Sequence, residues 1–255
     1  MTEAAESERN SLRVVVNKGM QITPVRDYVC VRAIVNRLAR VFILAILAAQ
    51  PGLARQDRDP TTDTAALAQA QRFVDEVIAQ SYPELHDAEI RLKVFHSRAD
   101  FFHTRFGIPQ FFFGRRMRYL IWINPQVCDR HAPEAGFRAI IAHELAHIAW
   151  FRRGSRIRLL CLTRLLSGSF AARFERRTDL QAIARGYGLE LKEYRQWLYQ
   201  NIPAEKLKEK QRNYFTPVEI DAILRLSAQH RNLLEYWDTR VPRNLEEIMQ
   251  AAPAK

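Results

Sequence analysis

The chain has 255 residues, of which 47% are apolar and 26% charged, and it carries a formal charge of +11. This composition, without internal repeats or low-complexity tracts, excludes a disordered or solenoid protein and predicts a globular chain that buries a core. The charge favours anionic partners, and a basic surface adapted for solubility explains it equally well.

Residues 1–54 are predicted to form an N-terminal leader. The apolar run 41–49 has nine residues, too few to span a bilayer, which needs about 20. Three arginines precede the run: Arg32, Arg37 and Arg40. Small residues follow it up to Ala54, and this order is typical of a secretory signal. We expect an exported, periplasmic or cell-envelope-associated domain, with an uncleaved weak anchor or a cytoplasmic protein as the alternatives.

Residues 60–252 are predicted to form one α+β domain, mostly α. A helix is expected over residues 65–80, with the N-cap signal Thr61-Thr62-Asp63 before it. Strands are expected over residues 90–96 and 117–123, where apolar residues alternate. Residues 110–123 are a candidate hairpin with Gly114 near its tip.

The rest of the chain is predicted to be helical. Apolar residues recur at helical spacing after Pro133. Further helices are expected over residues 157–172, 175–187, 217–230 and 244–250. Thr216-Pro217-Val218-Glu219 is a capping box with proline at the first helical position, so it marks the start of one of these helices.

The three cysteines, Cys30, Cys128 and Cys161, include no CxxC pair. This argues against a disulfide framework and against a cysteine-based zinc site. We expect Cys128 and Cys161 to be buried thiols, with a disulfide between them as the alternative in an oxidising compartment.

The segment His143-Glu144-Leu145-Ala146-His147 matches the pattern HExxH. On a helix, positions i and i+4 lie on one face, so both imidazoles can reach one metal ion. Glu144 lies about 100 degrees around the axis from His143, which places its carboxylate beside the metal as a general base. The alternative is a pair of structural histidines on a buried helix.

A zinc site needs a third protein ligand besides the two histidines. A metzincin would have glycine and histidine where this chain has Trp150 and Arg153, so that class is excluded. The only later histidine is His230. The other candidate is Glu175, with Asp179 one helical turn further on to accept a ring N–H from a ligating histidine. Taken without HExxH, this pair would indicate an exposed charged face flanked by arginines.

HELAH followed by ExxxD resembles the gluzincin zinc metallopeptidases. It is most similar to the families of the CAAX prenyl protease, the bacterial heat-shock membrane protease and the antibiotic-sensor peptidases. Those typically carry ExxAD, whereas this chain has Thr178 at the alanine position. The resemblance implies a zincin-like core with a small antiparallel sheet, an HExxH helix and a glutamate-bearing helix. It implies Zn²⁺ held by His143, His147 and Glu175, with Glu144 as the catalytic residue.

The resemblance also implies that an edge strand before the HExxH helix binds the substrate backbone by β-addition. The matching candidates are Gln110, Phe111, Phe112 and Phe113. The alternative for the three phenylalanines is a place in the core. Gluzincins often add a side chain that stabilises the oxyanion. The candidates for this role stay open: Tyr187, Tyr194, Tyr214 and His230.

An arginine-rich stretch, residues 152–177, is a candidate contact with an anionic membrane surface. An ordinary solvated helix face is the alternative. We therefore expect a zinc-dependent peptidase, an endopeptidase by its resemblance, that acts on a protein or peptide near the cell envelope, with nucleic acid not expected as a partner. Two alternatives stay open: a non-catalytic basic surface-binding module with structural or no zinc, and a cytosolic DNA-associated metalloprotease.

Overall fold

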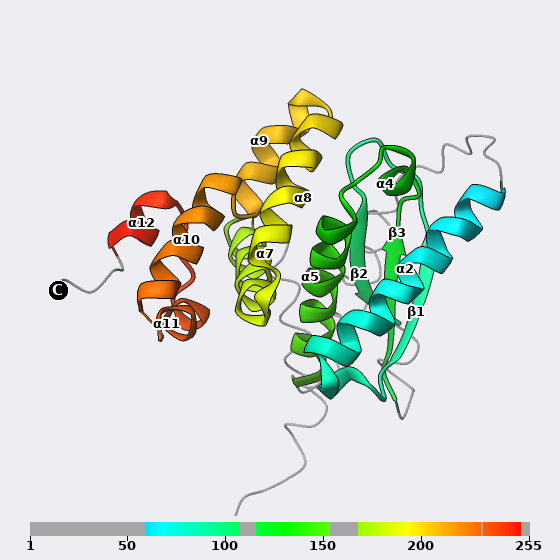
Figure 1. Cartoon of the computed structure of the whole chain (residues 1–255), viewed down its shortest axis with the longest axis horizontal. Coiled ribbons are helices and arrows are strands. Elements are labelled where there is room, and N and C mark those ends of the chain that lie inside the picture. The colour runs from blue at the N-terminus through cyan, green and yellow to red at the C-terminus, as the bar shows by residue number, and fades with distance from the viewer. Residues whose placement is uncertain (1–59, 108–115, 154–167, 231, 251–255) are drawn as a thin grey trace, which may run out of the picture. The chain divides into compact units, whose positions relative to one another are not determined.

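A three-stranded sheet forms the first part of the fold in the computed structural model, which describes residues 60–107, 116–153, 168–230 and 232–250 (Figure 1). Its strands are β1 (Glu89–Val94), β2 (Phe102–Phe106) and β3 (Arg118–Ile123), in the order β1-β3-β2. Strand β1 runs parallel to β3, and β2 runs antiparallel to it. The sheet is therefore mixed, whereas the expectation was an antiparallel one.

The two strands predicted from alternating apolar residues are confirmed as β1 and β3. Strand β2 was missed, because its five residues are all half-buried and show no alternation of apolar and polar side chains. It is β2, upstream of the predicted hairpin 110–123, that pairs with β3, with Phe102 opposite Ile123. Residues 110–115 of that hairpin lie outside the described residues.

Helices make up most of the described chain, which confirms the expected class, α+β and mostly α. The first are α2 (Pro60–Ser81), the 3-10 turn η1 (Pro83–Leu85), α4 (Gln126–Asp129) and α5 (Glu134–Arg153). After residue 168 come α7 (Gly168–Ala182), the π-helical segment η3 (Ile183–Tyr187), α8 (Gly188–Asn201), α9 (Ala204–Asn213), α10 (Pro217–Gln229), α11 (Leu233–Thr239) and α12 (Leu245–Gln250). Predicted helices correspond to α2, α5, α7 with η3, α10 and α12, whereas η1, α4, α8, α9 and α11 were not anticipated. Of the helix expected over residues 157–172, residues 157–167 lie outside the described residues, and the last five belong to α7.

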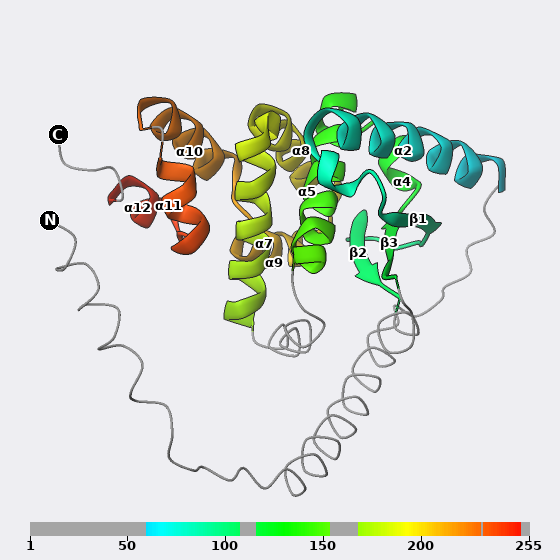
Figure 2. The same ribbon diagram turned by 90° about the horizontal axis from the view of Figure 1, so that it is seen from below.

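Helix α5 is the centre of the domain. It lies with α2 against the sheet, and α7 and α8 pack on its other side (Figures 1 and 2). Fourteen of its 20 residues are buried, so it is a core helix rather than a surface one. Gly136 permits the close approach of α8, because a Cβ there would lie 3.1 Å from the Cβ of Tyr194. The polar residues of HExxH are therefore held in an apolar interior.

A change of direction separates α7 from α8. Gly186 in η3 has a φ of 95°, a backbone conformation that glycine adopts without steric cost. The helix predicted over residues 175–187 thus ends at this kink, and the chain continues as α8. Helix α8 then returns to α5 and delivers Tyr194 and Arg195 to the interior.

Ion pairs attach α7 to the C-terminal helices. Arg176 is only 4% exposed and donates to Glu219 over 2.9 Å. The other oxygen of Glu219 accepts from the backbone N–H of Thr216, and this completes the capping box predicted at the start of α10. Arg177 binds Asp238 on α11 over 2.7 Å. The two arginines that follow Glu175 are therefore each paired within the fold, Arg176 in the interior and Arg177 at the surface.

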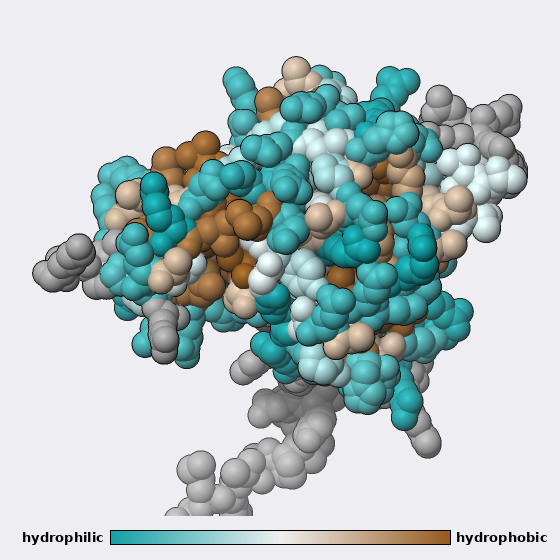
Figure 3. Space-filling view, in the orientation of Figure 1, coloured by the Kyte–Doolittle hydropathy of each residue, from teal (hydrophilic) through white to brown (hydrophobic). Residues whose placement is uncertain are grey.

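Several large apolar residues lie at the surface rather than in the core. The large exposed hydrophobic residues are Leu189, Val218, Tyr236, Leu245 and Met249. All but Leu189 belong to the helices α10 to α12, and apolar surface gathers over these helices in Figure 3. Within the described ranges, no helix combines the length and apolar character needed to cross a bilayer. Cys128 is a free thiol, but it is half-buried rather than buried as expected, and Cys30 and Cys161 fall outside the described residues.

The buried pair of Arg176 and Glu219 gives a test of how α7 is held. Replacement Arg176→Ala should lower the free energy of unfolding by about 3–5 kcal/mol, because it leaves a buried carboxylate without its cation. Urea denaturation of the metal-free protein, followed by circular dichroism, measures the change. The control Arg72→Ala, at an exposed position on α2, should shift the free energy by less than about 0.5 kcal/mol. Equal effects of the two replacements would contradict this account of the pair.

Candidate metal centre

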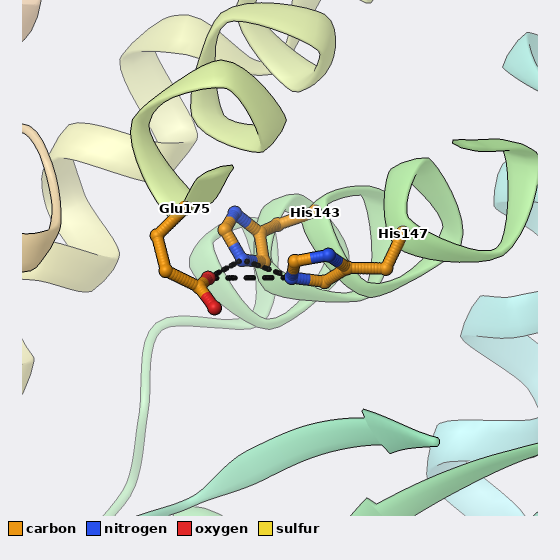
Figure 4. Close-up of side chains that lie close together, drawn as sticks. All are labelled: His143, His147 and Glu175. Carbon is orange, nitrogen blue, oxygen red and sulfur yellow. Dashed lines mark hydrogen bonds and ion pairs between the residues drawn. The ribbon is translucent and has the colours of Figure 1, made fainter. Parts of the chain in front are cut away.

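Three side chains from two helices converge at the centre of the domain (Figure 4). Helix α5 contributes His143 and His147, and α7 contributes Glu175. The Nε2 atoms of the two histidines are 3.2 Å apart. The Oε2 atom of Glu175 lies 3.2 Å from Nε2 of His143 and 3.3 Å from Nε2 of His147. The predicted ligand triad is thus one cluster in space, although 28 residues separate Glu175 from His147.

The spacing of this triangle fits a bound zinc ion. In a tetrahedral zinc site with bonds of about 2.0–2.1 Å, any two ligand atoms lie about 3.3–3.4 Å apart. The three observed distances match that edge length to within about 0.2 Å. The group has three members among the described residues, a number that leaves a fourth tetrahedral position for water or substrate. His143 and His147 are buried and Glu175 is 22% exposed, so the accessible side of the cluster is at the glutamate.

Asp179 orients the first histidine, as the sequence predicted. Its Oδ1 accepts from Nδ1 of His143 over 2.8 Å, which directs Nε2 of that ring toward Glu175. Burial alone would raise the pKa of Asp179, but Arg195 and the hydrogen bond from His143 lower it below its usual value. Arg195 donates to Oδ1 over 2.9 Å, and the backbone N–H of Phe215 donates to Oδ2 over 3.0 Å. The carboxylate is therefore ionised and held from three directions.

Neighbouring charges shift the pKa values of His143 and Glu175 in opposite directions. Burial lowers the pKa of this imidazole, but hydrogen bonds to Asp179 and Glu175 outweigh burial and raise it to about 9. In the same cluster, burial is outweighed for Glu175 by the neighbouring His147 and His143, which hold the pKa of its carboxyl far below the usual range. A metal cation that binds Nε2 of His143 would have to displace the proton from this nitrogen, because both need the same lone pair.

Glu144 lies beside the cluster, and one of its oxygens has no partner among the described residues. Glu144 is 4% exposed, and its Oε2 atom is buried without a hydrogen bond from this part of the chain. Together with His143 it lines a cavity of about 20 Å³, which is enough for about one water molecule. A buried acceptor that faces a space of this size is placed to hold a water and to receive its proton.

Two of the four candidates for oxyanion stabilisation lie at this cavity. Tyr194 and Tyr214 line it together with Glu144, and the rings of Tyr214 and His143 are 5.8 Å apart between centroids. Tyr187 instead shares a hydrogen bond with Ser81. His230 is the C-cap of α10 and is not a member of the metal-binding group. The fold therefore separates candidates that the sequence left equal.

The predicted substrate-binding residues Gln110, Phe111, Phe112 and Phe113 lie outside the described residues. Within the described part, the strand beside α5 is β2, which lies at one edge of the sheet. Thr104 on this strand donates to the backbone carbonyl of Glu144 over 3.4 Å. In Figure 4 a strand of the sheet passes next to the helix that carries both histidines.

Several arginines of the stretch 152–177 are engaged in ion pairs. Arg152 binds Asp87, and Arg176 and Arg177 have the partners described above. These contacts reduce the charge available to an external anionic surface. Residues 154–167 are not described, so contact of this stretch with a membrane stays a prediction.

Two residues of the centre were missed by sequence reasoning. Arg195 was hidden because nothing in its local sequence relates it to Asp179, 16 residues earlier. Thr178 had been noted only as a departure from alanine, yet its hydroxyl lies 3.3 Å from Nδ1 of His147. The sequence did offer one indication of this contact, because Thr178 is polar and lies on the same face of α7 as Glu175.

Comparisons with models of known protein families, with curated proteins and with solved structures find no match to this chain. The resemblance to the gluzincin families thus rests on the two sequence motifs. Any function assigned to the centre has to be argued from its own geometry.

Metal analysis tests the ligand set. Purified wild-type protein incubated with zinc should retain about one ion per chain, and Glu175→Ala should retain far less, because two histidines alone do not complete a zinc site. The measurement is elemental analysis by mass spectrometry after gel filtration. Glu193→Ala, at an exposed position on α8, is the control and should bind zinc normally. Equal zinc content in wild type and Glu175→Ala would remove Glu175 from the ligand set.

Proposed function

We propose that this protein is a zinc-dependent peptidase, with His143, His147 and Glu175 as metal ligands and Glu144 as general base. The observation that carries the proposal is a cluster of three possible ligands beside a water-sized cavity lined by Glu144, whose buried Oε2 has no partner among the described residues. A structural zinc site ordinarily has four protein ligands and no need for such a glutamate. This favours an enzyme over the alternative of a module with structural zinc.

The chemistry divides between the metal and the protein. Zinc at this position would polarise the scissile carbonyl and lower the pKa of water toward neutrality. Glu144 accepts the proton of the attacking water at its free Oε2 and then passes it to the departing amine. Asp179 holds His143 in place, and Arg195 and Phe215 hold Asp179. These residues keep the geometry constant while the charge at the reacting carbon changes.

For the developing oxyanion we assign Tyr214. Its ring lies next to His143, and burial followed by the negative charge of Glu175 raises the pKa of the phenol well above its ordinary value. The phenol therefore keeps its proton at neutral pH and can donate a hydrogen bond. Tyr194 lines the same cavity from α8 and is the second candidate.

The substrate class in this proposal is a protein or peptide in extended conformation. Among the described strands β2 lies at the edge of the sheet and is joined to Glu144 through Thr104, so a substrate strand added along it would pass the reacting centre. We add this strand to the proposed substrate contacts Gln110, Phe111, Phe112 and Phe113, which lie outside the described residues and stay a prediction. An exported, envelope-associated location remains a proposal that depends on the predicted leader.

Glu144→Gln separates catalysis from metal binding. The replacement should leave the zinc content unchanged and lower peptidase turnover by about 10²–10⁴-fold, because the amide cannot accept the proton. Zinc analysis and cleavage of a mixed library of internally quenched peptides measure the two properties on one preparation. Turnover that survives in a zinc-loaded Glu144→Gln protein would contradict the assigned base.

Tyr214→Phe tests the assigned donor. The loss of one oxyanion donor should lower kcat by about 10²–10³-fold, while KM and zinc content stay near their wild-type values. Steady-state kinetics on a peptide found in the library screen measure the effect. Tyr236→Phe, at an exposed position on α11, serves as the control. A normal kcat for Tyr214→Phe would transfer the role to another group such as Tyr194.

A further inference from the structure

Helix α7 presents three neighbouring polar residues to α5. Glu175, Thr178 and Asp179 are spaced i, i+3 and i+4, so they share one helical face. Glu175 points to the ligand cluster, and Asp179 binds the outer nitrogen of His143. Thr178 is 5% exposed and occupies the equivalent place at His147. Each histidine thus has its own partner on α7.

The hydrogen bonds of Thr178 determine the direction of the contact with His147. Its Oγ1 lies 2.9 Å from the carbonyl oxygen of Phe174 and 3.3 Å from Nδ1 of His147. A threonine hydroxyl has one hydrogen, and a carbonyl oxygen can only accept. The carbonyl of Phe174 is the closer of the two neighbours, and with the hydrogen donated to it a lone pair of Oγ1 faces the imidazole. In this arrangement Nδ1 of His147 is the donor of the 3.3 Å contact.

We propose that Thr178 is a positioning residue that fixes His147 in the Nδ1–H tautomer, so that its Nε2 lone pair is directed at the metal position. The inference rests on the proposed zinc site and adds a role for a residue outside the ligand set. Nε2 of His147 lies 3.2 Å from Nε2 of His143 and 3.3 Å from Oε2 of Glu175. In the other tautomer this nitrogen would carry the hydrogen, which would point into the cluster. That hydrogen would block coordination by His147.

The two outer contacts differ in chemistry. Asp179 is a carboxylate with two further donors, whereas Thr178 is a neutral hydroxyl whose only other bond is to its own helix. His147 is further held by aromatic neighbours, with Phe174 at 5.0 Å and Phe151 at 6.3 Å between ring centroids. Packing restricts the position of the ring, but it does not select the tautomer. The hydroxyl supplies this selection.

The experiment compares zinc affinity across replacements at this position. Thr178→Val keeps the branched shape without the hydroxyl, Thr178→Ser keeps the hydroxyl, and Thr178→Ala removes both. Competition with a chromophoric chelator at constant pH measures the zinc dissociation constant. Loss of such an outer contact typically weakens metal binding by about 10–100-fold. We expect that weakening for Thr178→Val and Thr178→Ala and near-normal affinity for Thr178→Ser.

A matched control and a spectroscopic measurement separate positioning from packing. Thr239→Val also removes a hydroxyl that donates to a carbonyl of its own helix, but it lies on α11 and should leave zinc affinity unchanged. In the metal-free protein, ¹⁵N NMR should show Nδ1 of His147 protonated in the wild type and in Thr178→Ser, and a mixture of tautomers in Thr178→Val. If Thr178→Val does not fold, the comparison of Thr178→Ser with Thr178→Ala provides the same test.

The outcomes also distinguish this inference from the proposed function. Wild-type affinity in Thr178→Val or Thr178→Ala, or equal weakening in Thr178→Ser, would overturn the role of the hydroxyl while the zinc peptidase proposal stands. A wild-type protein that binds no zinc would overturn the proposed function itself. A wild-type protein that binds zinc but cleaves no peptide would overturn the proposed peptidase activity and leave the role of Thr178 intact.

Discussion

The carboxylate of Asp179 is the contact on which the centre of the protein depends. It is fully buried, and burial of an isolated carboxylate is costly, so it has to be balanced by donors. His143 on α5, Arg195 on α8 and the backbone of Phe215 before α10 supply them. One side chain on α7 therefore connects α5, α8 and the segment before α10. The same bonds that offset its burial also orient a histidine.

The five residues from Glu175 to Asp179 show how closely structure and proposed chemistry are combined in α7. Glu175 completes the ligand cluster, and Arg176 and Arg177 anchor the helix to α10 and α11. Thr178 and Asp179 bind the outer nitrogens of the two histidines. A helix offers this division because consecutive residues point about 100 degrees apart. Residues directed at α5 serve the site, and those directed elsewhere hold the helix where the site needs it.

The environment of the cluster is divided between an aromatic and a polar side. His147 lies against Phe151 and Phe174, whereas His143 and Glu144 border a small cavity with Tyr194, Arg195 and Tyr214. Exclusion of bulk water strengthens electrostatic interactions within such a site. Among the described residues Oε2 of Glu144 has no donor, and several other buried polar atoms share this property. Glu144 is distinguished by its place at this cavity beside His143, and this combination is the physical basis of the proposed catalytic role.

Local spacing in the sequence was sufficient to predict the helices that carry the motifs and the capping box at Thr216. It also predicted that His143 and His147 share one helical face, because helical geometry fixes relations over three or four residues. The choice of Glu175 needed the chemistry of zinc ligands and the resemblance of the motifs, and the fold brings it to the histidines. Three features were decided only by tertiary structure. They are the pairing of β2 with β3, the role of Arg195 and the contact of Thr178 with His147. Each depends on which elements pack together across long separations in the chain, and no local pattern encodes that information.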